Sequence, residues 1–228
     1  MDVCQTLRNI AVFRNISQSA ADKVCSAAIL YKYGKNEVIF REKEETASFC
    51  FVAKGIVYLS KLNHHQESRV IFLCGEGEML NESLIDGHNA SATAMTLTET
   101  VIIKICVRDM RELMRQEPAI ADAVMKSMAG KIRRLYRQMK NTNNSVHLEQ
   151  QIAAKLWKLS KDYGIQEAYG RRIPFDLSIT FLADMVGSKR ETVSRKVKKL
   201  AELGLIEMKG KTFIINDQEE LLRFFHKS

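Results

Sequence analysis

The spacing of apolar residues changes along the chain, and each change predicts a different kind of element. Over residues 5–29 apolar side chains recur about one helical turn apart, which predicts short helices. Over residues 31–107 short runs rich in β-branched and aromatic residues alternate with turns such as Lys54-Gly55. Strands this short and evenly interrupted predict a β-roll or jelly-roll barrel.

A long helical pattern follows the β-rich segment. We expect Asp109 to start a short helix that ends near Pro118, which itself suits the first turn of the next helix. There, apolar residues recur three or four positions apart for more than five turns, and the opposite face carries Lys131 and Arg134. A stripe this narrow with charged flanks predicts pairing with a second copy, although packing on the β-rich segment would also explain it. The expected dimer interface is Val124, Met128, Ile132, Leu135 and Met139.

Beyond that helix, residues 141–145 are polar and are the predicted hinge, and a second helix is expected over about 147–162. Gly164 and Gly170 bracket a predicted loop. The chain is therefore predicted to be α+β, with an effector-sensing β-roll domain (1–117), a dimerisation helix with its hinge (118–144) and a DNA-binding domain (145–228).

Residues 178–203 predict two helices joined by a tight turn, with Gly187 at the turn because glycine adopts positive φ without a Cβ penalty. Ser188 is expected to cap the second helix, and Glu191 three residues later completes a capping-box pattern. In that helix Val193 and Val197 are spaced for burial, which leaves a polar and basic face outside. This is the pattern of a helix-turn-helix, whose second helix presents its N-terminal residues to the major groove of DNA.

Two short apolar runs, 204–208 and 212–215, flank Lys209-Gly210-Lys211. They predict a β-hairpin, and hence a winged helix-turn-helix. The wing lysines Lys209 and Lys211 can reach phosphates, a contact that carries no sequence information. Any one of them could instead be an ordinary solvated charge.

Charge is distributed unevenly, with a net −1 over residues 1–130 and +9 over residues 131–228. This asymmetry favours double-stranded DNA as the partner of the C-terminal part. The five cysteines are odd in number and scattered, which argues against a disulfide scaffold and for the reducing cytoplasm. No apolar run approaches the roughly 20 residues of a membrane span, and the polar start does not resemble a secretion signal.

The stretch 184–197, with Arg-Glu-Thr-Val-Ser-Arg at its core, closely resembles the helix-turn-helix of the CRP/FNR family of bacterial transcription regulators. The resemblance covers nearly the whole chain. It implies a homodimeric regulator that is not an enzyme, with RNA polymerase as a further partner. It also implies an inverted-repeat operator with TGA-like half-sites. The base-reading residues it implies are Arg190, Glu191, Ser194 and Arg195, with Ser188, Lys189 and Thr192 beside the wing lysines on the DNA backbone.

The sensor part departs from the members of this family that bind cyclic AMP. Their phosphate loop carries a Gly-Glu pair and then an Arg-Ser pair. Here Glu82 is kept, but Ala90 takes the position of the arginine, so a buried phosphate would lack its cation. Leu135 and Tyr136 fall where cyclic-AMP binders hold the base with hydroxyl side chains. Cyclic AMP is therefore not favoured, and a small organic or partly apolar effector is expected in a pocket of Asn81, Glu82, Ala90, Ser91, Leu135 and Tyr136.

Several alternatives remain at this point. The cysteines lack the cluster that an iron–sulfur site needs, and haem or metal ligation would have to use residues such as Cys74 or His88. A redox switch through an exposed cysteine and a roll without any ligand are further options. A cupin-type metal enzyme is the alternative from another class, but the five histidines lack its ligand spacing.

Overall fold

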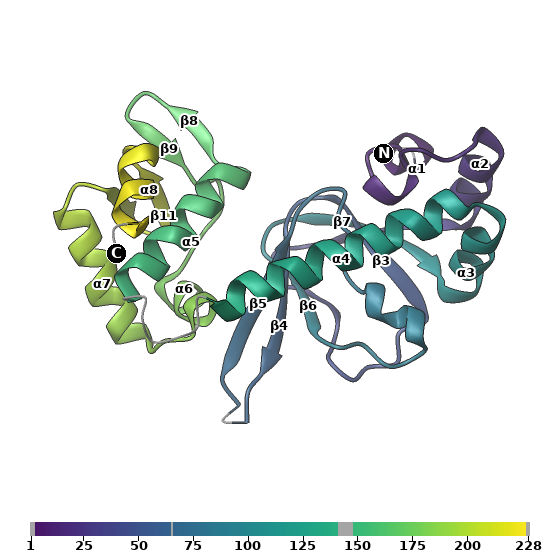
Figure 1. Ribbon diagram of the computed structural model, residues 1–228, viewed down its shortest axis with the longest axis horizontal. Helices are drawn as coiled ribbons and strands as arrows, with labels where there is room; N and C mark the ends of the chain where they lie inside the picture. Colours follow the sequence, from purple (N-terminus) through teal and green to yellow (C-terminus); the bar gives the residue numbers. More distant parts are fainter. Residues whose placement is uncertain (1–2, 65, 141–147, 227–228) are drawn as a thin grey trace. The chain divides into compact units, whose positions relative to one another are not determined.

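The computed structural model describes residues 3–64, 66–140 and 148–226. The chain forms two compact units, Met1–Tyr136 and Arg137–Ser228 (Figure 1). The predicted hinge at residues 141–145 lies outside the described residues.

The β-roll predicted for the first unit is confirmed as two antiparallel sheets. One sheet has the strand order β1-β7-β3 and the other β2-β6-β4-β5. A core that includes Val52, Val57 and Ile102 joins the two sheets. The strands are β1 (Ala28–Tyr33), β2 (Val38–Phe40), β3 (Ser48–Lys54), β4 (Val57–Leu62), β5 (Ser68–Cys74), β6 (Thr93–Thr96) and β7 (Thr100–Cys106).

A second core cluster forms where helices pack on the sheet of β3 and β7. Phe49 and Ile103 from the strands meet Phe13 and Val24 from the N-terminal segment in this cluster. The predicted short helices at the N-terminus are confirmed. The helix expected from Asp109 starts two residues earlier than predicted. The helices are α1 (Val3–Leu7), the 3₁₀ helix η1 (Ala11–Phe13), α2 (Gln18–Ala27), α3 (Val107–Gln116) and the long α4 (Pro118–Lys140).

In the second unit, helices pack around a small antiparallel sheet of order β10-β11-β9-β8. Its core includes Leu156, Leu182 and Phe213, all fully buried. The helices are α5 (Leu148–Tyr163), α6 (Ile179–Val186), α7 (Arg190–Glu202) and α8 (Gln218–His226). The strands are β8 (Ile165–Glu167), β9 (Gly170–Arg172), β10 (Ile206–Lys209) and β11 (Thr212–Ile215).

The loop predicted between Gly164 and Gly170 is wrong, because these residues form the β8–β9 hairpin. The two strands have three residues each and bury no side chain fully, so they lack the alternation that reveals longer strands. Gly170 is required by packing here, because a Cβ at this residue would overlap the carbonyl oxygen of Ile215.

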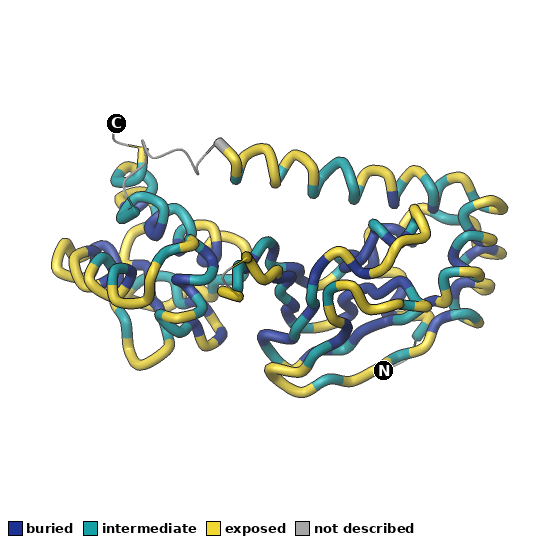
Figure 2. The backbone as a smooth tube through the Cα atoms, turned by 90° about the horizontal axis from the view of Figure 1, so that it is seen from below, coloured by how far each residue is buried: buried dark blue, intermediate teal, exposed yellow. Residues whose placement is uncertain are grey.

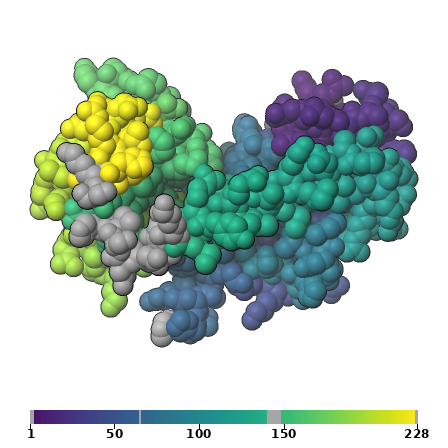
Figure 3. Space-filling model, in the orientation of Figure 1, coloured from purple at the N-terminus to yellow at the C-terminus, as the bar shows by residue number. Residues whose placement is uncertain are grey.

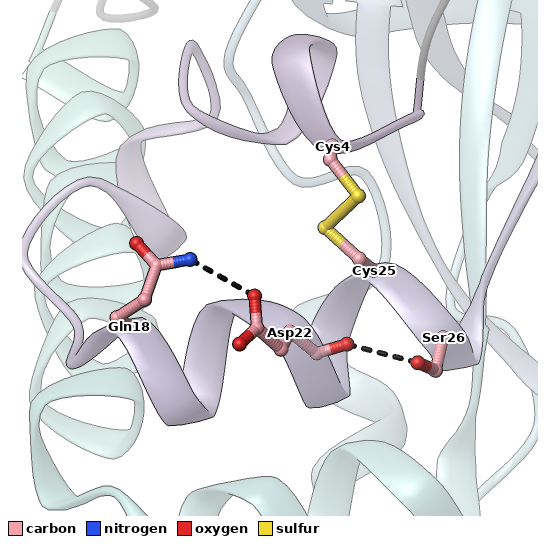
Figure 4. Close-up of a disulfide and its surroundings, with 5 residues drawn as sticks. All are labelled: Cys4, Gln18, Asp22, Cys25 and Ser26. Atoms are coloured by element: carbon pink, nitrogen blue, oxygen red, sulfur yellow. Dashed lines mark hydrogen bonds between the residues drawn. A yellow bond between two sulfur atoms is a disulfide. The ribbon is translucent and has the colours of Figure 1, made fainter.

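The structure adds a pairing that the sequence did not predict, since a disulfide joins Cys4 of α1 to Cys25 of α2 (Figure 4). The two residues are 21 positions apart, and their Cα atoms lie 5.2 Å from each other. Sequence spacing could not show this pairing, because it depends on how α1 and α2 fold against each other. No helix among the described residues has the length and apolar character needed to cross a membrane.

Candidate nucleic-acid interface and sensor site

The first helix of the predicted helix-turn-helix is α6, which ends at Gly187 as the sequence predicts. The cap at its start was not predicted. Ser178 caps it, with its hydroxyl accepting a hydrogen bond from the N–H of Phe181 at 3.0 Å. Gly187 ends it at φ 65°, and its N–H donates to the carbonyl of Ala183 at 2.7 Å. This left-handed residue turns the chain into α7.

The capping box predicted at Ser188 is wrong. The N–H of Ser188 donates back to the carbonyl of Ala183 at 3.2 Å, so this residue still belongs to the turn that closes α6. The N-cap of α7 is instead Lys189, whose side chain makes no capping hydrogen bond. The side chain of Glu191, in the first turn of α7, is therefore not used to cap the helix.

Helix α7 presents two chemically different sides. Val193, Val197 and Leu200 are buried, as their spacing predicts. Four polar residues near its N-terminus are exposed, and within the described part of the chain no hydrogen bond or ion pair engages their side chains. These four are Arg190, Glu191, Ser194 and Arg195. The helix thus offers two guanidinium groups, one carboxylate and one hydroxyl to a partner.

Two other basic residues of α7 are held by the protein itself. Lys196 and Lys199 both bind Glu149 of α5, with Nζ to carboxylate oxygen distances of 2.5 Å and 2.9 Å. Hydrogen bonds from Lys196 and then Lys199 lower the pKa of Glu149 below its usual 4.5. Sequence reasoning placed both lysines on the outer face and missed this contact, which anchors α7 to α5.

The wing predicted after α7 is confirmed as the β10–β11 hairpin (Figure 1). Gly210 makes its turn at φ 63°. Lys209 and Lys211 are exposed on either side of this glycine, and Lys209 forms an ion pair with Glu207 at 3.0 Å. The backbone N–H of Leu177, just before α6, donates to the carbonyl of Lys211 at 2.8 Å and ties the wing to the helix-turn-helix.

Helix α4 corrects part of the predicted dimer interface. Val124 is buried in the core of the first unit together with Ile120, so it cannot face a partner. Met128 is half-buried against the same core. Over the first two turns of α4, the predicted apolar stripe therefore faces the core of the first unit.

The exposed apolar residues of α4 keep the rest of the predicted stripe but start it at Met125. Among the described residues, five of the eleven exposed large hydrophobic residues lie on this helix, with exposed fractions between 39% and 68%. Figure 2 shows exposed and half-buried segments alternating along α4, and Figure 3 shows this helix on the surface of its unit. A line of apolar residues that starts at Met125 instead of Val124 has members alternately three and four residues apart. This is the heptad repeat of a coiled coil. We call this line the α4 seam: Met125, Met128, Ile132, Leu135 and Met139.

The sensor site centres on Glu82, which begins a short 3₁₀ helix, η2 (Glu82–Asp86). Its carboxylate is 4% exposed, and it accepts hydrogen bonds from Ser127 at 2.6 Å and from Lys131, both on α4. The side chain of Lys131 is 12% exposed, and its ammonium also donates to the carbonyls of Met79 at 2.8 Å and Leu80 at 3.2 Å. The prediction that Lys131 lies on the solvent face of α4 is therefore wrong.

A second ion pair joins α4 to the roll one helical turn further on. Arg134 donates to Glu78 at 2.6 Å and lies over the ring of Phe72, 5.2 Å from its centroid. Partial burial acts to lower the pKa of Arg134, but the opposite charge of Glu78 and its hydrogen bond outweigh this and raise that pKa. The four charges of Glu78, Glu82, Lys131 and Arg134 sum to zero.

The other residues predicted for the effector pocket have separate surroundings. Asn81 is buried, accepts from the N–H of Cys50 at 2.8 Å and donates to the carbonyl of Ser48 at 3.0 Å. Ala90 is buried, whereas Ser91 is exposed and lies 3.1 Å from the hydroxyl of Ser83. Leu135 and Tyr136 are exposed on α4. The structure thus brings Glu82 to α4 through Ser127 and Lys131, two residues that the sequence did not single out for this site.

Two domain profiles match the chain, one in each unit. Residues 30–117 match the cyclic nucleotide-binding domain, and residues 150–224 match the Crp-like helix-turn-helix domain. The chain belongs to the CRP/FNR family of transcription regulators. Proteins of this family bind DNA to regulate transcription and are not enzymes, so the alternative of a cupin-type enzyme is wrong.

Relatives in this family align with nearly the whole chain. A CRP-like cAMP-activated global transcriptional regulator of Mycobacterium tuberculosis is 24% identical over 226 residues, covering 96% of this chain and 98% of its own. The cAMP-activated global transcriptional regulator of Haemophilus influenzae is 27% identical over 190 residues, 82% of this chain and 83% of its own.

Solved structures share the fold at low identity. The c-di-GMP-responsive global regulator CLP of Xanthomonas campestris has a TM-score of 0.78, with 20% identity over 88% of this chain and 100% of its own. A CRP-family transcriptional regulator of Thermus thermophilus has a TM-score of 0.74, with 22% identity over 87% of this chain and 97% of its own. Among the described residues, no group of three or more His, Cys, Asp or Glu side chains could hold a metal ion.

Proposed function

We propose that this chain acts as an effector-gated homodimer that recognises an inverted-repeat operator through α7. The observation that carries this proposal is the set of four polar side chains at the start of α7, which no described residue engages. Lys196 and Lys199 of the same helix are bound by Glu149. The four side chains without such a partner are therefore the ones available to DNA.

The chemistry of these side chains suits the edges of base pairs in the major groove. Arg190 and Arg195 can each donate two hydrogen bonds to O6 and N7 of guanine, and Glu191 can accept from N4 of cytosine. Ser194 lies between them on the exposed side and can donate or accept. A carboxylate on a basic helix opposes DNA binding unless it meets such a donor. We therefore propose that Glu191 reads one G·C pair in a TGA-like half-site.

Contacts to the DNA backbone complete the interface. The residues proposed for them are Ser188, Lys189, Thr192, Lys209 and Lys211. The first three lie in the turn and the first helical turn of α7, and the last two lie on the wing. Such contacts fix the position of the protein on the duplex and contribute equally on every sequence.

We place the dimer contact on the α4 seam, because its spacing matches a coiled coil and all its residues except half-buried Met128 are exposed in a single chain. Two copies of a DNA-binding unit then face two half-sites about one helical turn apart, so the operator has the symmetry of the dimer. In this arrangement residues 1–117 sense, residues 118–144 join the copies and residues 145–228 bind DNA. RNA polymerase as a partner and the cytoplasm as location stay predictions.

For the roll we propose a small effector that is uncharged or partly apolar, and not cyclic AMP. Buried Ala90 provides no cation, and Lys131 and Arg134 are already neutralised by Glu82 and Glu78. A buried phosphate would have no counter-charge left among these residues. An effector that displaced Lys131 from Glu82 would change how α4 lies on the roll, which would shift the equilibrium between two states of the dimer.

Selection from a pool of random DNA duplexes tests the proposed reading. At a fixed salt concentration, the full chain should enrich an inverted repeat whose half-sites are TGA-like and about 10 base pairs apart, centre to centre. Salt must be fixed because phosphate contacts dominate the total affinity. A pool without any enriched inverted repeat would contradict the proposal.

A further inference from the structure

The disulfide between α1 and α2 lies in the sensor unit, away from the residues assigned above. Figure 4 shows Cys4 and Cys25 projecting from their helices toward each other. Cys4 is exposed to solvent, whereas Cys25 is half-buried and packs against the core. One sulfur of the pair is therefore open to small reactants, and the other is held in place beside it.

The remaining cysteines differ in reactivity. Burial raises the pKa of Cys50 and of Cys74 to about 12 each, so at neutral pH neither forms an appreciable amount of thiolate. Since the thiolate is the form that attacks disulfides, both buried residues are inert. Cys106 is exposed and carries a free thiol. Of the exposed cysteines, only Cys4 is joined to a second cysteine of the same chain.

We propose that Cys4 and Cys25 form a reversible dithiol–disulfide couple, a modification site that exchanges with low-molecular-weight disulfides and thiols. In the oxidising direction, one cysteine thiolate attacks a sulfur of the small disulfide and releases one small thiol. The second cysteine then attacks the mixed disulfide and releases the other small thiol. The protein loses two electrons and two protons, which the small disulfide takes up as it becomes two thiols.

The local structure allows the start of α1 to loosen while its end stays in the core. This helix has only five residues, too few to be stable alone in water. The chain becomes buried at Thr6 and Leu7, two to three residues after Cys4. Without the disulfide the first turn of α1 is held by partly buried Val3, while Leu7 stays in the core cluster.

The helix on the other side of the disulfide is connected to the start of α4. Ser17, the N-cap of α2, donates to Glu117 at 2.7 Å, and Lys23 donates to Gln116 at 2.6 Å. Glu117 directly precedes Pro118, the first residue of α4. The core cluster that holds Leu7 also includes residues of α4. The couple therefore lies in a segment that contacts the base of α4.

The test uses the full chain in a series of buffers that run from reduced to oxidised glutathione. Each sample is quenched by alkylation, and the N-terminal peptides are analysed by mass spectrometry. We expect Cys4 and Cys25 to become protected from alkylation together as the buffers become more oxidising. The midpoint of this change should lie inside the glutathione series. We also expect the oxidised form to unfold about 5 °C or more above the reduced form, because the bond constrains the unfolded chain.

Two variants with matched chemistry separate this couple from other thiols. Cys106→Ser removes an exposed thiol and should leave both the midpoint and the thermal shift unchanged. Cys4→Ser should abolish both, and circular dichroism checks that this exposed substitution still folds. The proposal is overturned if Cys4 and Cys25 stay separately alkylated at the oxidised end, if they stay paired at the reduced end, or if the two forms unfold at the same temperature.

Discussion

Helices α4 and α7 use their charged and apolar residues in opposite ways. On α4 the cations Lys131 and Arg134 are bound to carboxylates of the same unit, and what remains exposed includes the apolar α4 seam. On α7 the large apolar residues are buried, and what remains exposed includes the cations Arg190 and Arg195.

The difference indicates what each helix binds. An exposed apolar line with heptad spacing suits another protein surface of the same kind, which we propose is a second copy of α4. Exposed cations that no described side chain neutralises suit a polyanion. In the sensor unit the ammonium of Lys131 is likewise bound by a carboxylate of the same chain, that of Glu82.

The largest expected effect comes from placing a charge on the α4 seam. Ile132→Glu puts a carboxylate in the middle of the seam, where it would have to be buried against its copy. We expect sedimentation to show a monomer, and operator affinity to fall about 1,000-fold because the two half-sites are then bound separately.

Lys126→Gln is the matched control for this variant, since it changes the net charge by the same amount on the same helix. Lys126 is exposed and pairs only weakly with Asp122 one turn away. If both variants dissociate the dimer equally, or if Ile132→Glu remains dimeric, the α4 seam is not the interface.

The second prediction breaks the charge balance of the sensor site. Lys131→Met leaves the carboxylate of Glu82 buried without its cation, which should lower the free energy of unfolding by about 3 kcal/mol. Adding Glu82→Gln should recover most of this loss, because the uncompensated charge is then gone. Denaturant unfolding measures both. Lys126→Met, at an exposed ion pair, should cost no more than about 0.5 kcal/mol, and equal losses for the two lysines would show that Lys131 is not a buried partner.

The third prediction separates the two sides of α4. Val124→Ala should lower the free energy of unfolding by about 2 kcal/mol, because Val124 fills the core of its own unit. Met125→Ala should instead weaken the dimer several-fold and leave unfolding nearly unchanged. Stability is measured in the monomeric Ile132→Glu background, so that dimer formation does not contribute. If Val124→Ala instead weakened the dimer and Met125→Ala lowered the stability, Val124 would belong to the interface.

The smallest expected effect concerns Lys196 and Lys199, the two lysines of α7 that bind Glu149. Glu149→Gln should lower the stability of the second unit by less than about 1 kcal/mol at pH 7. Because the pKa of Glu149 is lowered in the folded state, its contribution is complete above pH 4.5 and is lost as the pH falls through the folded pKa. The difference between wild type and variant should therefore shrink below pH 4.5. Glu202→Gln, at an exposed pair with Lys198, is the matched control and should cost no more than about 0.5 kcal/mol at pH 7.

Some of these features could be predicted from the sequence and others could not, for physical reasons. The buried face of α7 and the ends of α6 follow from local spacing and from Ser178 and Gly187, which act within one turn. The contact between Lys131 and Glu82 joins residues 49 positions apart, and no local pattern reports it.

The errors at Val124 and Ser188 have a different origin. A stripe at helical spacing is equally compatible with two neighbouring lines on α4, and only the position of the roll decides which one is buried. At Ser188 the pattern of a capping box was present, but the hydrogen bond to Ala183 kept this residue in the preceding turn. In both cases a tertiary or turn contact overrode a valid local pattern.

The central claim, that exposed side chains of α7 read base edges, is tested most directly by comparing the sequences selected by wild type and by Glu191→Ala. We expect the variant to lose preference at one G·C pair in each half-site, with discrimination there reduced by about 1–3 kcal/mol, while the other positions and their spacing stay the same. Lys209→Ala, as a control on the wing, should weaken binding to all sequences alike. If Glu191→Ala selects the same operator with unchanged preference at every position, α7 does not read the operator in this way.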